Sequence, residues 1–319
     1  MAIFLTLVSI TSIYILKENL IITILLVFVS FLAIYNSIIE TYVALTFIAP
    51  GKVKASLEGG NWNMIRLQHE GPEIAIVQNM QVKKAPLMIL IHGWRSSSNS
   101  MAGRAELYLK RGFHVMIMEL PGHGSSEDVK KWNAGVPTRN LIHLFNNLDE
   151  VCDTSLISKI YFHGHSMGAF VFLRFSREAS KLEKSNLIEG YILESPLTCY
   201  SQIFEESCKK LFVPKFMKPL FWKRLKFHFN SINPGFDRIN DVKDLDVPIW
   251  GLPNKPTLVI QAANDERLGL IHYKNLVDAF KNMGRLNLLT NIIIEDLTHA
   301  GARNNSNRNE TINHWLDNY

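Results

Sequence analysis

The stretch "YFHGHSMGAF", residues 161–170, sets a serine between two glycines directly after a run of aromatic and apolar residues. Serine is poorly suited to a buried strand, and a glycine on either side weakens a strand further. The spacing of Gly164, Ser166 and Gly168 is explained if the chain turns sharply there, from a strand into a helix. Such a turn would hold the serine hydroxyl out at the edge of a sheet, where it is available for chemistry.

Short apolar runs alternate with helical patterns over most of the chain after residue 50. Strands are predicted at residues 74–80, 87–93, 113–124, 159–166, 190–196, 256–265 and 291–301, and helices at 102–112, 138–153, 167–181, 271–284 and 310–319. This alternation is typical of a mostly parallel sheet that is covered by helices on both faces. We therefore expect an α/β fold in which ligands bind beyond the carboxyl ends of the strands.

Residues 197–255 interrupt the alternation and contain no clear strand. A structureless segment of that length would be unusual inside a compact domain. The portion "FEESCKKLFVPKFMKPLFWKRLKFHF" has a helical pattern, with breaks predicted at Pro214 and Pro219. The sequence therefore predicts a helical cap inserted into a core that is formed by residues 51–196 and 256–319.

The first 50 residues predict a membrane anchor of one or two helices. The run from Leu20 to Ile39 is 20 residues long and has no charge, and as a helix it would rise about 30 Å, the thickness of the hydrocarbon core. Residues 1–16 are short for a span but fit the first arm of a helical hairpin. A cleaved signal peptide would carry basic residues before the apolar run, and none is present. A buried hairpin of a soluble protein is the remaining alternative.

The net charge of +5 is too diffuse to indicate nucleic acid binding, although it suits an anionic membrane surface. Lys52, Lys54 and Arg66 follow the apolar run. Because positive residues prefer the cytoplasmic side of a membrane, we expect the large domain to be cytoplasmic.

The residues that usually hold metals or cofactors form no recognisable pattern. Cys152, Cys199 and Cys208 contain no C-x-x-C pair, which indicates neither a disulfide framework nor a zinc site and favours reduced thiols. The "GHGSS" stretch lacks the Lys-Ser/Thr of a phosphate-binding loop. We therefore expect no cofactor.

Ser166 needs help from neighbouring groups to act as a nucleophile at neutral pH. The helix predicted from Met167 would supply free backbone N–H groups at its N-terminus, and these groups stabilise negative charge. G-x-S-x-G alone arises often by chance. An apolar strand before it and a helix after it favour a catalytic serine over a tight turn that merely contains one.

Three motifs resemble those of the α/β-hydrolase family. "FHGHSMGA" resembles its nucleophile elbow, "ILIHGW" the His-Gly turn after its third strand, and "ELPGHGSS" the loop after its fourth strand. The resemblance covers about residues 60–319 and is closest to the monoglyceride-lipase-like and lysophospholipase-like serine hydrolases, in which G-H-S-M-G is common. It implies an α/β-hydrolase fold, with a mostly parallel central sheet flanked by helices and an inserted helical cap.

The resemblance also implies a serine, acid, histidine order along the chain. His299, after the last predicted strand, would take the proton from Ser166 and later return it to the leaving group. Asp265, after the penultimate strand, would orient His299, and Glu266 lies next to it. Glu194 is the alternative acid, because some relatives carry the acid one strand earlier.

Two backbone donors would stabilise the oxyanion of the tetrahedral intermediate. The N–H of Met167 is one, and the resemblance gives the N–H of Trp94 as the other. Removal of such a donor typically costs about 2.7–4 kcal/mol of transition-state stabilisation. His92 and His123 are expected to brace their turns instead of acting as bases.

A serine at position 166 predicts an acyl-enzyme and therefore ester, thioester or amide substrates, whereas dehalogenase-like and epoxide-hydrolase-like members carry aspartate there. From Lys209 to Phe229 the cap has seven Lys or Arg residues and no Asp or Glu, interleaved with aromatic and aliphatic side chains. This pattern fits a cap that rests on an anionic bilayer or lines an acyl pocket, and also a packed cap with a solvated basic face.

The sequence as a whole predicts a membrane-anchored serine hydrolase, of the esterase, lipase or lysophospholipase type. Its partners would be a small acyl ester, lipid-like or of medium chain length, and membrane lipid, with no nucleic acid. Two alternatives stay open. An acyltransferase or thioesterase would use the same three residues, and a non-catalytic α/β-hydrolase-like binding protein would not need them.

Overall fold

The computed structural model describes residues 20–49, 51–68, 71–300 and 303–319, together with Leu7 and Thr11. Apart from Leu7 and Thr11, the predicted first span over residues 1–16 therefore lies outside the described residues. The rest of the predicted elements fall inside them, except for residue 301 at the end of the predicted strand 291–301.

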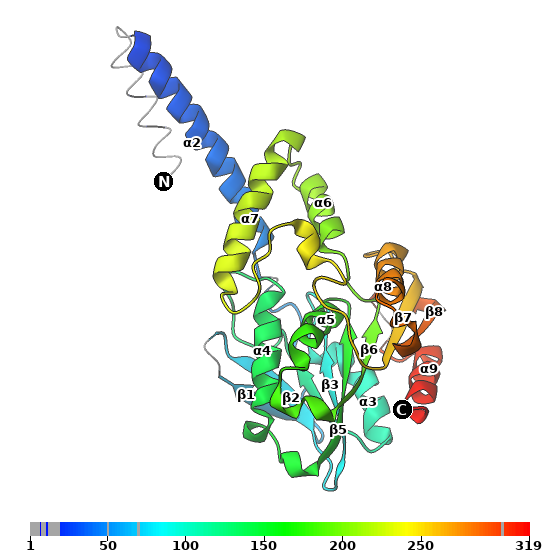
Figure 1. Ribbon diagram of the computed structural model, residues 1–319. Coiled ribbons are helices and arrows are strands. Elements are labelled where there is room, and N and C mark those ends of the chain that lie inside the picture. The colour runs from blue at the N-terminus through cyan, green and yellow to red at the C-terminus, as the bar shows by residue number, and fades with distance from the viewer. Residues whose placement is uncertain (1–6, 8–10, 12–19, 50, 69–70, 301–302) are drawn as a thin grey trace.

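Eight strands form one sheet in the order β1-β2-β4-β3-β5-β6-β7-β8 (Figure 1). Their bounds are β1 Asn63–Leu67, β2 Ile74–Asn79, β3 Ala85–Ile91, β4 His114–Met118, β5 Ile157–His165, β6 Ile188–Glu194, β7 Thr257–Asn264 and β8 Leu289–Thr298. Only β2 runs against its neighbours, and the other adjacent pairs in this sheet are parallel. The predicted mostly parallel α/β sheet is confirmed by this pairing. Its central strands β3 to β6 are mostly apolar and largely buried, as expected for a sheet that is covered on both faces.

The strand β1 has no counterpart among the strands predicted from the sequence. This edge strand has five residues, and only Leu67 among them is fully buried. Its apolar pattern is correspondingly weak, and its pairing with β2 depends on a partner that the local sequence does not reveal.

Five helices cover the two faces of the sheet. They are α3 Ala102–Lys110, α4 Gly135–Asn146, α5 Met167–Ala179, α8 Leu270–Asn282 and α9 Ser306–Asp317. Side chains of α4, α5 and α8 belong to one hydrophobic core, and those of α3 and α9 to a second core on the opposite face. Short 3-10 turns occur at Ser98–Met101, Leu148–Glu150, Thr154–Leu156, Glu183–Leu187 and Leu286–Leu288.

The segment 197–255 forms two helices above the sheet, α6 Tyr200–Lys210 and α7 Lys218–Ile232 (Figure 1). Two 3-10 turns, Lys215–Met217 and Val242–Leu245, accompany them. Pro214 lies in the predicted break between the helices. The predicted break at Pro219 is wrong, because this residue lies in the first turn of α7, where a proline interrupts no helical hydrogen bond.

The N-terminal helix α2, Leu20–Thr46, is long and apolar enough to cross a membrane, with a mean hydropathy of 2.4 over its most apolar stretch. It runs beside α7 and then extends away from the sheet and its helices (Figure 1). Near its C-terminus Ile39 and Val43 are buried, and both belong to the larger hydrophobic core together with Phe47 just after the helix.

Candidate active site

Ser166 joins the end of β5 to the start of α5 in a strained backbone conformation. Its φ of 53° and ψ of −110° lie in a region that non-glycine residues rarely occupy. The Ser166 N–H donates to the Glu194 carbonyl on β6 at 2.9 Å, which fixes the turn to the neighbouring strand. The sharp turn that the sequence predicts is therefore present.

The two flanking glycines are required by close backbone approaches. A Cβ at Gly164 would lie 2.5 Å from the Ala169 nitrogen, and a Cβ at Gly168 would lie 2.1 Å from the Ile91 carbonyl oxygen. Any side chain at either position would push α5 away from β3 and β5. The glycines thus allow the helix to start directly above the strand ends.

Three side chains that are distant in sequence form a chain of hydrogen bonds. His299 Nε2 lies 3.0 Å from Ser166 Oγ, and His299 Nδ1 lies 2.8 Å from Asp265 Oδ2. Because an ionised carboxylate only accepts, Nδ1 carries the proton and Nε2 accepts from the serine hydroxyl. The structure therefore brings together the nucleophile, base and acid that the sequence analysis named.

Asp265 is held in the ionised form by its surroundings. Burial by itself raises the pKa of Asp265, but hydrogen bonds from His299, the Leu268 N–H and Gln261 outweigh burial and lower the pKa to about 2. The Leu268 N–H donates at 2.8 Å and Gln261 Nε2 at 3.0 Å. A carboxylate so anchored can fix the orientation and tautomer of the His299 ring.

Glu194, the alternative acid, has different partners. Its buried carboxylate accepts two hydrogen bonds from Arg104, at 2.5 and 2.6 Å, and lies 3.2 Å from His163 Nε2. Burial raises the pKa of Glu194, but Arg104 and the His163 hydrogen bond outweigh it and hold that pKa well below its usual range. The structure does not bring Glu194 to His299 Nδ1, which is bonded to Asp265 instead.

The backbone of His299 is held from two sides. His165 Nε2 donates to the His299 carbonyl at 2.7 Å, and the His299 N–H donates to Glu266 Oε2 at 3.4 Å. Burial lowers the pKa of His165 to about 3, so this ring stays neutral and donates through Nε2. His165 lies inside the motif quoted above, but no role for it was predicted from the sequence.

The turn at Gly93 and Trp94 passes directly against Ser166. A Cβ at Gly93 would lie 3.0 Å from His165 Nδ1 and 3.3 Å from Ser166 Cβ. Trp94 and Met167 line one pocket together with Ser166. Met167 is the first residue of α5, so its N–H has no acceptor within the helix. The two residues expected to supply the oxyanion donors therefore both lie beside the serine.

His92 and His123 support that turn. The Leu120 N–H donates to His92 Nε2 at 3.1 Å, and His92 Nδ1 donates to the Gly93 carbonyl at 2.8 Å. Burial, with a smaller effect from His123, lowers the pKa of His92 to about 3. His123 accepts from the Arg95 N–H at 3.1 Å, and burial lowers its pKa. Both rings are occupied by backbone contacts, in agreement with the bracing role expected for them.

Glu119, which the sequence analysis missed, ties three segments together behind this turn. Its buried carboxylate accepts from Ser56 Oγ at 2.8 Å, from the Ser98 N–H at 2.9 Å and hydroxyl at 2.7 Å, and from the Ser125 N–H at 2.6 Å. The feature of the sequence that could have indicated this role is the position of an acidic residue directly after an apolar strand, in "IMELPGHG".

Ser166 and His299 line a pocket of about 700 Å³ between the strand ends, α6 and the end of α2. Its apolar lining consists of Leu45, Val53, Trp94, Trp132, Ala134, Met167, Phe170, Leu197, Tyr200, Ile203, Leu211, Phe229, Leu245, Trp250, Leu268 and Ala300. Its charged lining, within the described part of the chain, consists of Lys54, Arg95, Arg104, Lys210 and Arg267, with no Asp or Glu. The pocket therefore suits an apolar ligand and disfavours a cationic one.

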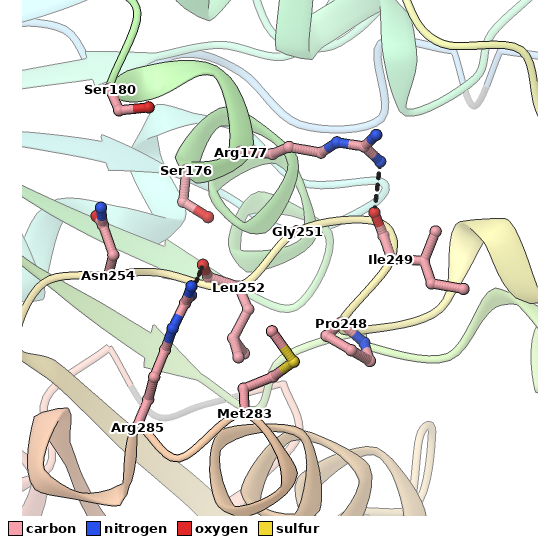
Figure 2. Close-up of a pocket in the computed structure, with 10 residues that line it drawn as sticks. All are labelled: Ser176, Arg177, Ser180, Pro248, Ile249, Gly251, Leu252, Asn254, Met283 and Arg285. Atoms are coloured by element: carbon pink, nitrogen blue, oxygen red, sulfur yellow. Dashed lines mark hydrogen bonds between the residues drawn. The ribbon is translucent and has the colours of Figure 1, made fainter.

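A second pocket of about 420 Å³ lies between α5 and residues 248–254 (Figure 2). Arg177 donates there to the Ile249 carbonyl, and Arg285 donates to the Leu252 carbonyl (Figure 2). None of the residues lining this pocket belongs to the Ser166 hydrogen-bond chain. The larger pocket is therefore the candidate active site.

Solved structures share this architecture. The α/β hydrolase domain-containing protein 10 from mouse superposes with a TM-score of 0.57 at 15% identity, over 80% of this chain and 99% of that chain. The esterase PF2001 from Pyrococcus furiosus superposes with a TM-score of 0.60 at 15% identity, over 86% of this chain and 97% of that chain. Est1E from Butyrivibrio proteoclasticus superposes with a TM-score of 0.56 at 16% identity, over 80% of this chain and 98% of that chain. At such identities the likeness establishes the fold alone.

A comparison with curated protein sequences found no match to this chain. Residues 83–246, just over half of the chain, match the family described as serine aminopeptidase, S33. The match includes the serine turn, β3 to β6 and both helices above the sheet. The predicted α/β-hydrolase fold is thereby confirmed, and the chain belongs to the S33 serine aminopeptidase family of α/β hydrolases.

Proposed function

We propose that this protein is a serine hydrolase that cleaves carboxylic esters through an acyl-enzyme on Ser166. The observation that carries the proposal is the hydrogen-bond chain from Ser166 through His299 to Asp265, at 3.0 and 2.8 Å, beside an apolar pocket of about 700 Å³. The S33 family match and the esterases of the same fold support a hydrolase.

Acylation would begin with attack of Ser166 Oγ on the ester carbonyl carbon, while His299 Nε2 accepts the hydroxyl proton. The carbonyl oxygen becomes an oxyanion, which the N–H groups of Trp94 and Met167 stabilise. Asp265 balances the positive charge that forms on His299. The bond to the leaving oxygen then breaks, and His299 gives its proton to the departing alcohol.

Deacylation would repeat these steps with water. His299 accepts a proton from a water molecule as the water oxygen bonds to the acyl carbon. The tetrahedral intermediate uses the same two backbone donors. The bond to Ser166 Oγ then breaks, His299 returns the proton to the serine, and the carboxylic acid leaves.

The charge of the pocket favours esters over the aminopeptidase activity for which the family is named. An aminopeptidase must bind the positively charged N-terminal amine of a peptide, and a carboxylate is the usual partner for such a group. The described lining has five cationic side chains and no Asp or Glu. Arg104 among them is neutralised by Glu194, and the others repel an ammonium group.

The apolar lining supports an acyl group of medium or greater length. Rings of Trp94, Trp132 and Phe170 line the pocket, which is within the size range that binds drug-sized ligands. Burial of each methylene contributes about 0.8 kcal/mol, or roughly a fourfold gain in binding. We therefore expect kcat/KM to rise from acetyl to octanoyl esters.

We further propose that α2 anchors the protein in a membrane, with residues 1–50 as the anchor, 51–196 and 256–319 as the hydrolase core and 197–255 as the cap. Burial of Ile39, Val43 and Phe47 in the core favours a retained helix over a cleaved signal sequence. The side of the membrane follows only from Lys52, Lys54 and Arg66, which favour the cytoplasm. Protease protection of intact and opened cells tests this orientation.

Labelling of the full-length protein with a fluorophosphonate probe tests the nucleophile. We expect the wild type and a Ser180→Ala variant, altered at an exposed serine, to be labelled, and Ser166→Ala to remain unlabelled. The same proteins are then assayed with p-nitrophenyl acetate, butyrate and octanoate and with aminoacyl p-nitroanilides.

Hydrolysis of the esters only, rising with chain length, supports the proposal. Faster cleavage of the aminoacyl anilides, or equal labelling of Ser166→Ala, would overturn it. Product analysis with a competing alcohol separates hydrolysis from acyl transfer, because a transferase yields the new ester.

A further inference from the structure

The pocket above Ser166 extends to the ends of two helices, the apolar helix α2 and the cap helix α6. Leu45 and Thr46, at the end of α2, line the pocket, and so do Lys210 and Leu211, where α6 ends. The helix that is the candidate anchor is therefore also a wall of the candidate active site. Its position bears directly on how a substrate reaches the serine.

The end of α2 is clamped onto the rest of the protein. Glu40 pairs with Arg224 of α7, with 3.1 Å between Oε1 and Nε, and lies 3.6 Å from His228 Nε2. The backbone N–H of Trp132 donates to the Phe47 carbonyl at 2.8 Å. The wall that α2 contributes is thus fixed to the cap on one side and to the core on the other.

The cap tip, which we define as residues 209–218 between α6 and α7, reaches along α2 toward its apolar part. The ring of Phe216 stacks on Tyr35, with 6.4 Å between ring centroids. Tyr35 belongs to the charge-free run of α2 and precedes Glu40 by five residues, or about 7 Å along the helix axis. If the bilayer surface lies near Glu40, Phe216 lies at the depth where interfacial side chains bury their apolar faces.

The cap tip exposes two large apolar side chains. Phe212 is 87% exposed and Phe216 is 73% exposed. Phe212 also has a φ of 54°, in the left-handed region where a helix usually ends with glycine. Packing of the described protein gains nothing from a strained and exposed phenylalanine, so its contact is expected outside the protein.

The charges of the cap tip match an anionic lipid surface. Lys209, Lys210, Lys215 and Lys218 surround the two phenylalanines, and residues 209–218 contain no Asp or Glu. Lys218 is paired with Glu205 at 2.5 Å, which leaves an excess of positive charge at the tip. Lysines around exposed aromatic side chains are typical of segments that bind the headgroup region of a bilayer.

We propose that the cap tip inserts into the bilayer surface beside α2, so that the pocket opens onto the membrane and takes a membrane-resident acyl lipid directly from it. The inference rests on the proposed ester hydrolysis and adds the source of the substrate. The continuity of the pocket from Ser166 to Leu211 and Leu45 supplies the path for the acyl chain.

Fluorescence quenching tests the insertion without reference to activity. The full-length Phe216→Cys variant is labelled with an NBD maleimide and reconstituted in phosphatidylcholine–phosphatidylglycerol vesicles that carry spin-labelled lipid. Burial raises the pKa of Cys152 and of Cys199 to about 11 and also raises the pKa of Cys208, so the introduced thiol reacts preferentially. We expect strong quenching at position 216 and little at the control Val82→Cys, which is 98% exposed. Equal quenching at the two positions would overturn the inference.

Kinetics separate membrane access from chemistry. For Phe212→Gly combined with Phe216→Ser, we expect at least about a tenfold loss of hydrolysis of a long-chain acylglycerol in those vesicles. Hydrolysis of soluble p-nitrophenyl butyrate should stay within about twofold of wild type, because neither phenylalanine lines the pocket. The control Val82→Ser with Leu286→Ser removes exposed apolar side chains elsewhere and should leave both rates unchanged.

An unchanged rate on vesicles would overturn the inference and leave ester hydrolysis intact. Equal losses on both substrates would overturn it as well, because the cap tip would then act on the pocket and not on membrane access. Failure of the proposed function looks different, since the wild type would then hydrolyse neither substrate.

Discussion

At the residue scale, two carboxylates lie at the ends of neighbouring strands beside Ser166 and have different partners. Asp265 bonds to His299 Nδ1, whereas Glu194 neutralises Arg104 inside the core. Replacement of Asp265 should therefore change the reaction, and replacement of Glu194 should change the stability of the protein.

We expect Asp265→Asn to lower kcat on p-nitrophenyl butyrate by about 10⁴, because an amide no longer selects the tautomer in which His299 Nε2 accepts the serine proton. The melting temperature should change little. Steady-state kinetics and thermal unfolding of the same preparation measure both effects. Retention of more than a tenth of wild-type kcat would exclude Asp265 as the orienting acid.

Glu194→Gln is the matched counterpart. It leaves the buried Arg104 charge without its carboxylate, which should lower the free energy of unfolding by about 3–5 kcal/mol. The folded fraction should retain the fluorophosphonate reactivity of Ser166. A loss of reactivity with unchanged stability would instead favour Glu194 as the acid.

The sequence was sufficient to name Ser166, His299 and Asp265, because each follows a strand whose apolar pattern is clear. Glu119 and His165 were missed for a physical reason. Their contacts are with Ser56, Ser98 and the His299 carbonyl, and such pairings over large sequence separations leave no local pattern.

At the element scale, the strands β2 to β7 could be predicted because each buries an apolar run, and α5 because it follows the glycine turn. The strand β8 could be predicted from its run of Ile292, Ile293 and Ile294, although only Ile294 of these is buried. The edge strand β1 and the uninterrupted start of α7 could not. The strand β1 forms because it hydrogen-bonds to β2, a partner that its own sequence does not reveal. The helix α7 is not broken at Pro219 because this residue lies in the first helical turn.

The end of α6 allows a stability prediction. The Val213 N–H donates to the Cys208 carbonyl at 2.8 Å, which closes the helix while Phe212 adopts its positive φ. Phe212→Gly should raise the free energy of unfolding by about 1 kcal/mol, because glycine adopts this conformation without strain. Thermal unfolding in detergent measures the change.

The control for this change is Phe212→Ala, which removes the ring but keeps a Cβ in the left-handed region. It should not share the gain. Equal stability of the glycine and alanine variants would show that the conformation of residue 212 stores no strain.

At the scale of the whole molecule, several histidines are buried in the neutral form. Burial lowers the pKa of His92 and His165 to about 3 and the pKa of His163 and His272 to about 4. In the unfolded chain these rings titrate near 6.5, so between about pH 6.5 and 4 the unfolded state binds more protons than the folded state. The free energy of unfolding should therefore fall as the pH drops through this window.

His272 offers a single-site test of this pH dependence. Its Nδ1 accepts from the Thr198 N–H at 3.1 Å and the Cys199 N–H at 3.2 Å, which a protonated ring could not do. The His272→Gln variant should reduce the slope of unfolding free energy against pH by about 1 kcal/mol per unit between pH 6 and 5. The exposed His314→Gln should leave the slope unchanged. Parallel slopes for His272→Gln and wild type would contradict the prediction.

The burial of Ile39, Val43 and Phe47 has a practical consequence for enzymology. A shortened protein that starts at residue 51 would lose Leu45 and Thr46 from the pocket and leave an apolar stripe uncovered on the core. Substrate preferences measured on such a fragment would describe a wider and more solvent-exposed cavity than that of the full-length protein. Screening for inhibitors should accordingly use the intact polypeptide held in lipid discs.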